Sequence, residues 1–107
     1  MQLIAEEPAS SPLLSQGHAG PHKIQGIGAN FVPAVLDRSL LSSVQTVENE
    51  AAFAMMHLLA ETEGVFCGIS SGAAVSAAAD VLREDAMRGK TVVAILPDTG
   101  ERYLSCL

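Results

Sequence analysis

The most constraining feature of this chain is a breaker-rich segment near its start. Seven prolines and glycines lie between residues 8 and 30, so neither a helical nor a strand period can persist there. Loops longer than about 12–15 residues are uncommon in compact domains and often carry function. The sequence therefore predicts a long loop over residues 8–30 and makes this loop a candidate site.

Regular elements are expected on both sides of this loop. A short apolar strand is predicted over residues 2–5, and near-alternating apolar residues predict a second strand over residues 42–47. Apolar residues at helical spacing then predict a helix that runs to about Glu63, with Thr46 as its cap and Gly64 as its stop.

The second half of the chain alternates between strand and helix patterns. A very short strand is predicted over residues 65–67, a helix over about 73–87, and a continuous apolar strand over 91–96. A turn follows at residues 97–100, and a further element begins at Glu101. This order indicates an α/β fold, with a parallel or mixed sheet and flanking helices in a three-layer-like arrangement.

Composition narrows the range of functions. Hydrophobic residues make up 49% of the 107 residues and charged residues only 17%, which indicates a globular domain, or a piece of one, with part of its surface placed against other protein. The net charge is −6 and the six basic residues are scattered, so nucleic acid is not an expected partner.

The sequence also gives expectations about the setting of the chain. No apolar run approaches the about 20 residues of a membrane span. Two isolated cysteines favour a reduced, cytoplasmic setting. A core strand that begins at Gln2 hints at truncation.

The turn between the short strand and the following helix contains Gly68, Ser70 and Gly72. This Gly-x-Ser-x-Gly pattern, with a strand before it and a helix after it, is typical of the nucleophile elbow of α/β-hydrolases. In those enzymes a histidine follows the serine, and here no histidine follows Ser70. A serine that caps the helix is the simpler interpretation, and a hydrolase stays a minor alternative.

Two other local patterns are incomplete. Gly26 and Gly28 resemble the start of a dinucleotide fingerprint, but Phe31 stands where the third glycine is needed and no strand precedes them. His18 and His22 have a zinc-binding spacing for a helix, yet the glycines and proline around them forbid one. The sequence therefore predicts no metal site.

Four blocks of the sequence together resemble the cysteine synthases (O-acetylserine sulfhydrylases). Residues 5–12 are similar to the family's Ala-Val-Glu-Pro-x-x-Ser-Pro segment, and residues 20–29 match its Gly-Pro-His-Lys-Ile-Gln-Gly-Ile-Gly-Ala loop. Residues 68–74 match its Gly-Ile-Ser-Ser-Gly-Ala-Ala turn, and residues 96–105 match its Leu-Pro-Asp-Thr-Gly-Glu-Arg-Tyr-Leu-Ser ending. The blocks follow the family's order and spacing, so residues 1–107 are identified as a C-terminal portion of such an enzyme.

The resemblance implies an incomplete piece of the two-domain fold that is shared with tryptophan synthase β subunits. It implies pyridoxal 5′-phosphate (PLP) as cofactor and a transferase or lyase reaction, in which acetate is eliminated from O-acetylserine and sulfide adds to give cysteine. Ser70 matches the serine that hydrogen-bonds the pyridine nitrogen, and Gln25 and Gly26 match a loop on the substrate side. The complete enzymes are homodimers, and their pocket also receives the C-terminal tail of serine acetyltransferase.

The resemblance also shows what this chain lacks. The family's Schiff-base lysine lies in an N-terminal portion with no counterpart here, and neither Lys23 nor Lys90 matches it. No catalytic residue is therefore assigned, and the chain is expected to be inactive alone. Glu6 replaces a usually apolar residue, and Asn30 a small one. A cystathionine β-synthase-like PLP enzyme and a non-catalytic fragment or binding module stay open as alternatives.

Overall fold

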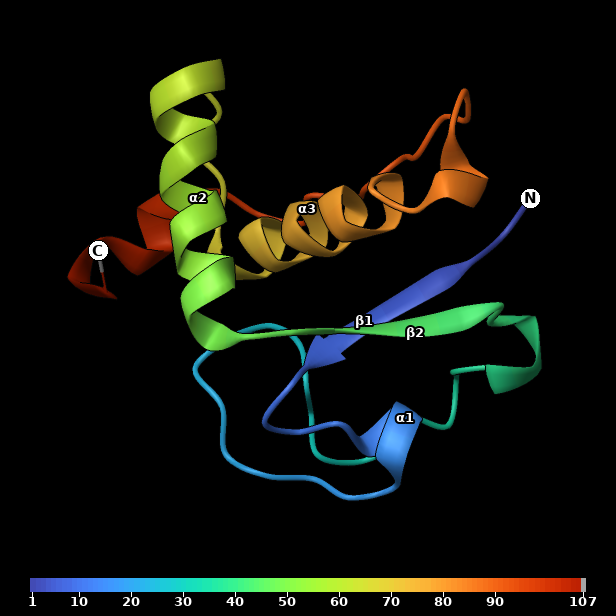
Figure 1. Cartoon of the computed structure of the whole chain (residues 1–107). Helices are drawn as coiled ribbons and strands as arrows, with labels where there is room; N and C mark the ends of the chain where they lie inside the picture. Colours follow the sequence, from blue (N-terminus) through green and yellow to red (C-terminus); the bar gives the residue numbers. More distant parts are fainter. Residues whose placement is uncertain (107) are drawn as a thin grey trace.

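The computed structural model describes residues 1–106 and shows a small α/β assembly (Figure 1). Two strands form the sheet, and two long helices make up most of the regular structure. Four short helical turns complete the chain. In chain order the elements are β1 (Ile4–Pro8), α1 (Leu13–Gln16), η1 (Arg38–Leu40), β2 (Ser43–Val47), α2 (Asn49–Glu63), α3 (Ile69–Leu82), η2 (Asp85–Met87) and η3 (Gly100–Cys106).

The two strands are parallel neighbours although a long connection separates them in sequence. Their register runs from Ile4 opposite Ser43 to Pro8 opposite Val47. A backbone hydrogen bond from Ala9 N to Val47 O, of 2.8 Å, extends the pairing beyond the carboxyl end of β1. The sheet is therefore fixed although its strands are only five residues long.

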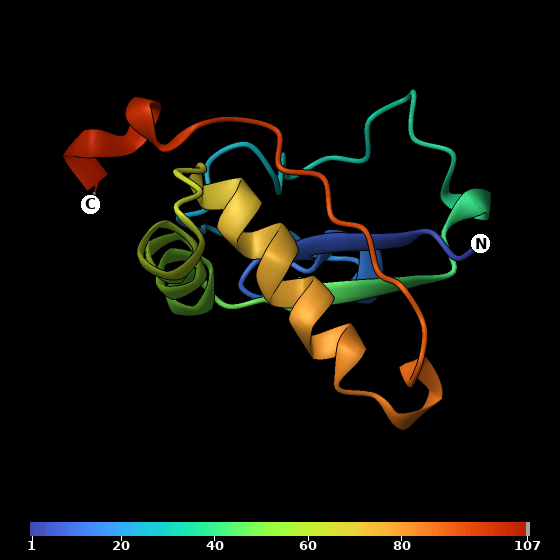
Figure 2. The same ribbon diagram turned by 90° about the horizontal axis from the view of Figure 1, so that it is seen from above.

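Helix α3 lies across the sheet, and α2 crosses the N-terminal half of α3 (Figures 1 and 2). The crossing is close because position 72 is a glycine. A Cβ there would lie 2.3 Å from the carbonyl oxygen of Ala52 and 2.9 Å from the amide nitrogen of Met56. Most core residues gather around this crossing: Ile24, Val47, Ala52, Met56, Cys67, Ile69, Ala73, Ala77 and Tyr103.

The structure confirms the α/β class, with a small parallel sheet and flanking helices, and it shifts several predicted boundaries. Helix α3 begins at Ile69 and includes Ser70, whereas the sequence predicted a start near residue 73. Thr46 lies within β2, and α2 starts after Glu48 without any side-chain cap. One helical turn, α1, forms inside the loop that was expected to have no regular structure.

Two predicted strands are wrong. The segment 65–67 contributes only an isolated bridge between Cys67 and Thr99. Residues 91–96 form no strand, although burial alternates along them: Val92 and Ala94 are partly buried, while Val93 and Ile95 are 81% and 75% exposed. A strand requires a hydrogen-bonded neighbour, and a cavity separates this segment from β1. In the described part of the chain, no helix is long and apolar enough to cross a membrane.

Candidate functional site

Ser70 lies in the first turn of α3, directly beside the loop that the sequence singled out. Its side chain is 4% exposed, and its hydroxyl makes no hydrogen bond among the described residues. A Cβ added at Gly26 would lie 3.3 Å from the Ser70 Oγ, and the Gly26 φ of 100° favours glycine. The fold thus brings Gly26 and Ser70 together, although 44 positions separate residues 26 and 70 in the sequence.

His22 holds the loop that carries Gly26. The Ile24 amide donates to the Nδ1 of His22 over 3.1 Å, so the proton of the neutral ring lies on Nε2 and is donated to the Gly28 carbonyl at 2.7 Å. Ile24 itself is fully buried in the core, whereas Gln25 and Gly26 are exposed. The loop is therefore anchored on both sides of the two residues predicted to bind substrate.

Asn49, at the start of α2, adds a second anchor. Its side-chain oxygen accepts a hydrogen bond of 3.0 Å from the Lys23 amide. This bond joins the loop to the helix that also packs against α3. The loop and the Ser70 turn are therefore positioned by one continuous packed unit.

The turn at residues 97–100 packs against the start of α3, the helix that carries Ser70. The Asp98 carbonyl accepts from the Gly68 amide at 3.2 Å and from the Ser71 hydroxyl at 3.5 Å. The Tyr103 hydroxyl donates to Oδ2 of Asp98, while Oδ1 is buried without a hydrogen bond among the described residues. Sequence reasoning missed this Asp98–Tyr103 pair, because a spacing of five has no meaning in a regular helix or strand.

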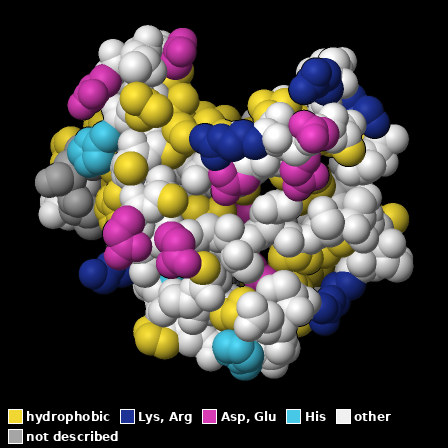
Figure 3. Space-filling view, viewed as in Figure 1, with side chains coloured by type: hydrophobic (Ala, Val, Ile, Leu, Met, Phe, Trp, Pro, Cys, Tyr) yellow, Lys and Arg dark blue, Asp and Glu magenta, His cyan; other side chains and the backbone are white. Residues whose placement is uncertain are grey.

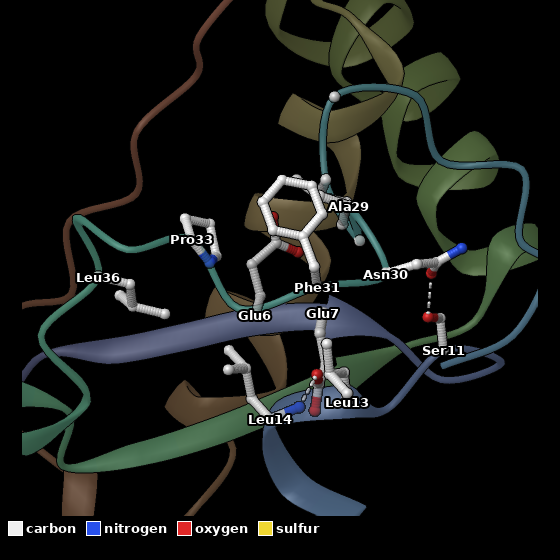
Figure 4. A pocket seen from close by; sticks show the side chains of 13 residues that line it. Glu6, Glu7, Ser11, Leu13, Leu14, Ala29, Asn30, Phe31, Pro33 and Leu36 are labelled. Atoms are coloured by element: carbon white, nitrogen blue, oxygen red, sulfur yellow. Dashed lines mark hydrogen bonds between the residues drawn. The ribbon is translucent and has the colours of Figure 1, made fainter. Parts of the chain in front are cut away.

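A cavity of about 220 Å³ lies between β1 and the loop (Figure 4). Glu6 and Glu7 both line it, but their environments differ. Glu7 accepts backbone hydrogen bonds from Leu14 at 2.7 Å and Ser15 at 2.9 Å. The Oε2 of Glu6 is buried with no hydrogen-bond partner among the described residues, and this burial raises the pKa of Glu6 to about 7.

Asn30 also lines this cavity and has a structural partner. Its side-chain oxygen accepts a hydrogen bond of 2.7 Å from the Ser11 hydroxyl, drawn as a dashed line in Figure 4. The Ser11 oxygen in turn accepts from the Gly20 amide at 3.1 Å. Asn30 therefore ties the two ends of the loop together, and its φ of 65° marks the bend where this happens.

The site offers little support for a hydrolase. Both ring nitrogens of His22 are occupied by loop backbone groups, and His18 and His57 are exposed. Burial raises the pKa of the Cys67 thiol, and the nearby Asp98 adds to this effect, so Cys67 is not an activated thiolate. Among the residues described, no group of three histidine, cysteine or acidic side chains is placed to hold a metal ion.

Comparisons with known proteins place this geometry in context. The family model of the pyridoxal-phosphate dependent enzymes matches residues 1–98. The chain is 48% identical over 105 residues to the cysteine synthase of Staphylococcus aureus strain Mu50, and the match covers 98% of this chain and 34% of that protein. The chain therefore spans about a third of the length of the curated relatives that it matches.

Solved structures agree with the sequence match. The crystal structure of the Entamoeba histolytica cysteine synthase superposes with a TM-score of 0.95 at 38% identity, over 98% of this chain and 31% of that one. The O-acetylserine dependent cystathionine β-synthase from Helicobacter pylori superposes with a TM-score of 0.81, also at 38% identity, over 98% of this chain and 34% of that one. The matched family model covers nearly the whole chain, and the chain therefore belongs to the pyridoxal-phosphate dependent enzymes.

Proposed function

We propose that this chain forms the part of a PLP-dependent cysteine synthase that faces the pyridine nitrogen of the cofactor and one side of the substrate. When this chain is combined with the rest of such an enzyme, the reaction would replace the acetate of O-acetylserine with sulfide and give cysteine. The observation that carries the proposal is the position of Ser70 in the first turn of α3, where a Cβ at Gly26 would lie 3.3 Å from the Ser70 Oγ. No hydrogen bond of this hydroxyl to another described residue competes with a ligand placed there.

The residues around Ser70 fit the pyridine side of this cofactor. A serine hydroxyl can donate to an unprotonated ring nitrogen, whereas a carboxylate would keep that nitrogen protonated. Ser70 lies at the N-terminal, positive end of a helix of 14 residues, which further disfavours a proton there. PLP, when bound, supplies the electron sink for the elimination. By leaving that nitrogen unprotonated, Ser70 would weaken the sink and so favour quick loss of a good leaving group.

The substrate side is proposed for Gln25 and Gly26. Both are exposed at the tip of a loop that His22 and Ile24 anchor from within. Gly26 lies next to the Ser70 hydroxyl, and a Cβ at position 26 would lie 3.3 Å from the Ser70 Oγ, so glycine leaves this hydroxyl less covered than any other residue would. Gln25 can offer an amide donor and acceptor to substrate beside this turn.

The lysine that tethers the cofactor is proposed to come from a part of the enzyme outside these 107 residues. Lys23 is exposed on the loop, and Lys90 lines a different cavity, next to the first residues of the chain. Neither lysine is placed at the Ser70 turn. The isolated chain is therefore expected to have no cysteine synthase activity.

The test is to combine the chain with the part of the Staphylococcus aureus enzyme that the match leaves uncovered. The purified complex should show the visible absorbance of bound PLP and should form cysteine from O-acetylserine and sulfide. Ser70→Ala should weaken PLP binding about 2- to 10-fold, the equivalent of one hydrogen bond, while Ser76→Ala in the same helix serves as the matched control. A complex that forms but binds no PLP would refute the proposal.

The same complex separates two related activities. The Helicobacter pylori structure shows that a cystathionine β-synthase can share this fold, so homocysteine should be offered in place of sulfide. We expect turnover with sulfide, because the 0.95 superposition on a cysteine synthase is closer than the 0.81 superposition. Preferred turnover with homocysteine would assign the chain to the second activity.

Further partners follow from the exposed surface. Apolar side chains reach the surface over α2 (Figure 3), where Leu58 is 48% exposed, and this supports a protein partner and a homodimer of the complete enzyme. The tail of serine acetyltransferase is a proposed ligand at Gln25 and Gly26, and titration of such a peptide would test it. The buried free thiol of Cys67 is compatible with the reduced cytoplasm, which immunolocalisation would check.

A further inference from the structure

Two positions at which this chain departs from the family lie at one cavity. Glu6 stands where the family usually has an apolar residue, and Asn30 stands where a small residue is usual. Both line the cavity of about 220 Å³ between β1 and the loop, although 24 positions separate residues 6 and 30 in the sequence (Figure 4). Gly26 lines this cavity as well, whereas Ser70 and Gln25 do not. The residues that set this chain apart therefore meet next to the loop that carries Gly26.

Glu6 gives the cavity a carboxylate oxygen that has no partner. Its Oε2 is buried and makes no hydrogen bond among the described residues. Glu7, the other acidic residue of the lining, has both oxygens occupied by backbone amides of α1. No lysine, arginine or histidine is among the described residues that line the cavity. What the Glu6 carboxylate lacks is a positively charged hydrogen-bond donor.

The other side of Glu6 supplies no such donor. Glu6 also borders a larger cavity, which is lined by Lys90 and by Met1 with its terminal amine. Among the described residues, the ion pairs join Arg83 to Asp80 and Arg88 to Asp85, and none includes Glu6. The charge of a Glu6 carboxylate is therefore not compensated from either side.

The remaining walls of the smaller cavity favour an organic cation over a metal ion. Most of the lining side chains are apolar, namely Leu13, Leu14, Ile27, Phe31, Pro33 and Leu36. A hard metal cation takes about six oxygen ligands, and within the described chain no group of three histidine, cysteine or acidic side chains is placed to hold one. Apolar walls around a single unpaired carboxylate instead suit an alkyl chain that ends in a charged amine.

We propose that this cavity binds a small primary alkylammonium ion, with its charged end on Glu6 and its alkyl chain against the leucine walls. A water molecule takes up about 30 Å³ of liquid, so the cavity has room for roughly seven heavy atoms. The Glu6 side chain rises from β1 toward the segment that carries Phe31 (Figure 4), and the face of this ring can add a cation–π contact. Asn30 closes one end of the site through its hydrogen bond with Ser11.

The experiment is an NMR titration of the full chain with n-butylammonium at pH 8, which follows the amide shifts of residues 26–31. We expect saturable shifts with a dissociation constant of about 1–10 mM, as befits so small a ligand. Glu6→Gln should weaken binding at least about tenfold, because it removes the charge of the acceptor. Glu61→Gln, on the exposed surface of α2, is the matched control and should bind like the unmodified chain.

The pH dependence gives a second measurement. The ion needs the deprotonated carboxylate, and burial raises the pKa of Glu6 to about 7. The affinity of the unmodified chain should therefore fall about tenfold between pH 8 and pH 6. The weak residual binding of Glu6→Gln should show no such fall, and a parallel fall in this variant would overturn the role of Glu6.

Two neutral and anionic probes of the same length complete the test. Butan-1-ol that binds as tightly as n-butylammonium would show that the apolar walls alone account for binding, and butyrate that binds as tightly would show that no cation is selected. Either result, or the absence of saturable shifts with n-butylammonium, would overturn the inference. All these measurements use the chain without PLP, so their failure leaves the proposed function standing, and a complex that binds no PLP leaves this site standing.

Discussion

Replacing Glu6 by glutamine should stabilise the chain at pH 8 and leave its stability at pH 4 unchanged. Burial raises the pKa of Glu6 from 4.5 to about 7, and its buried Oε2 has no hydrogen-bond partner among the described residues. A change of that size corresponds to roughly 3 kcal/mol if it is wholly retained. Because part of the side chain still contacts water, we reduce the expected effect to about 1–2 kcal/mol.

The sign follows from proton binding. Between pH 4.5 and about pH 7 the folded chain holds a proton at Glu6 that the unfolded chain has released. Stability therefore falls as the pH rises through this window and levels off above it, while below pH 4.5 both states are protonated. Glutamine has no such proton, so the Glu6→Gln variant should lose this pH dependence.

The assay is urea unfolding followed by circular dichroism, from pH 4 to pH 9, at concentrations where the chain is monomeric. Glu61→Gln, on the exposed surface of α2, is the matched control and should follow the unmodified chain at every pH. The reasoning fails if Glu6→Gln also runs parallel to the unmodified chain, or if its gain appears at pH 4 and vanishes at pH 8.

Three further substitutions test the packing that positions the site. Gly72→Ala should destabilise the chain by about 1–2 kcal/mol in urea unfolding, because overpacking at the α2–α3 crossing outweighs the better helix propensity of alanine; a gain in stability would contradict the close approach. Tyr103→Phe should cost about 1.5–3 kcal/mol in the same assay, since it leaves the Asp98 carboxylate without its hydroxyl donor; an unchanged midpoint would count against this pair. His22→Ala should speed amide exchange at Ile24 at least about tenfold while exchange in α2 stays the same; equal rates at Ile24 would show that the loop does not depend on the imidazole.

Local sequence patterns were enough to place the two long helices. Apolar spacing and the stop at Gly64 located α2 to within a few residues, because those signals act within the helix itself. The same reasoning failed for residues 91–96, whose apolar run is strand-like but which a cavity separates from β1. A strand is defined by its partner, so a sequence can show the propensity without the pairing.

The candidate site could be predicted only in part. Nothing in the spacing of Gly26 and Ser70 indicates that they meet, and their pairing was expected only through the family resemblance. The sequence analysis also missed that both ring nitrogens of His22 hydrogen-bond to the loop backbone. A histidine within a glycine-rich loop is a signal that could have suggested this. The sequence analysis noted that Glu6 replaces a residue that is usually apolar in the family. That its Oε2 is buried without a hydrogen-bond partner among the described residues can be seen only in the folded structure.

The most direct test of the proposed role of Ser70 is ¹⁵N NMR of the cofactor ring. The sample is the complex of this chain with the uncovered part of the Staphylococcus aureus enzyme. With ¹⁵N-labelled PLP, the account predicts an unprotonated pyridine nitrogen in the unmodified complex and a protonated one in the Ser70→Asp variant. Identical nitrogen shifts in the two complexes would show that Ser70 does not face the ring, and the assignment of this turn would have to be abandoned.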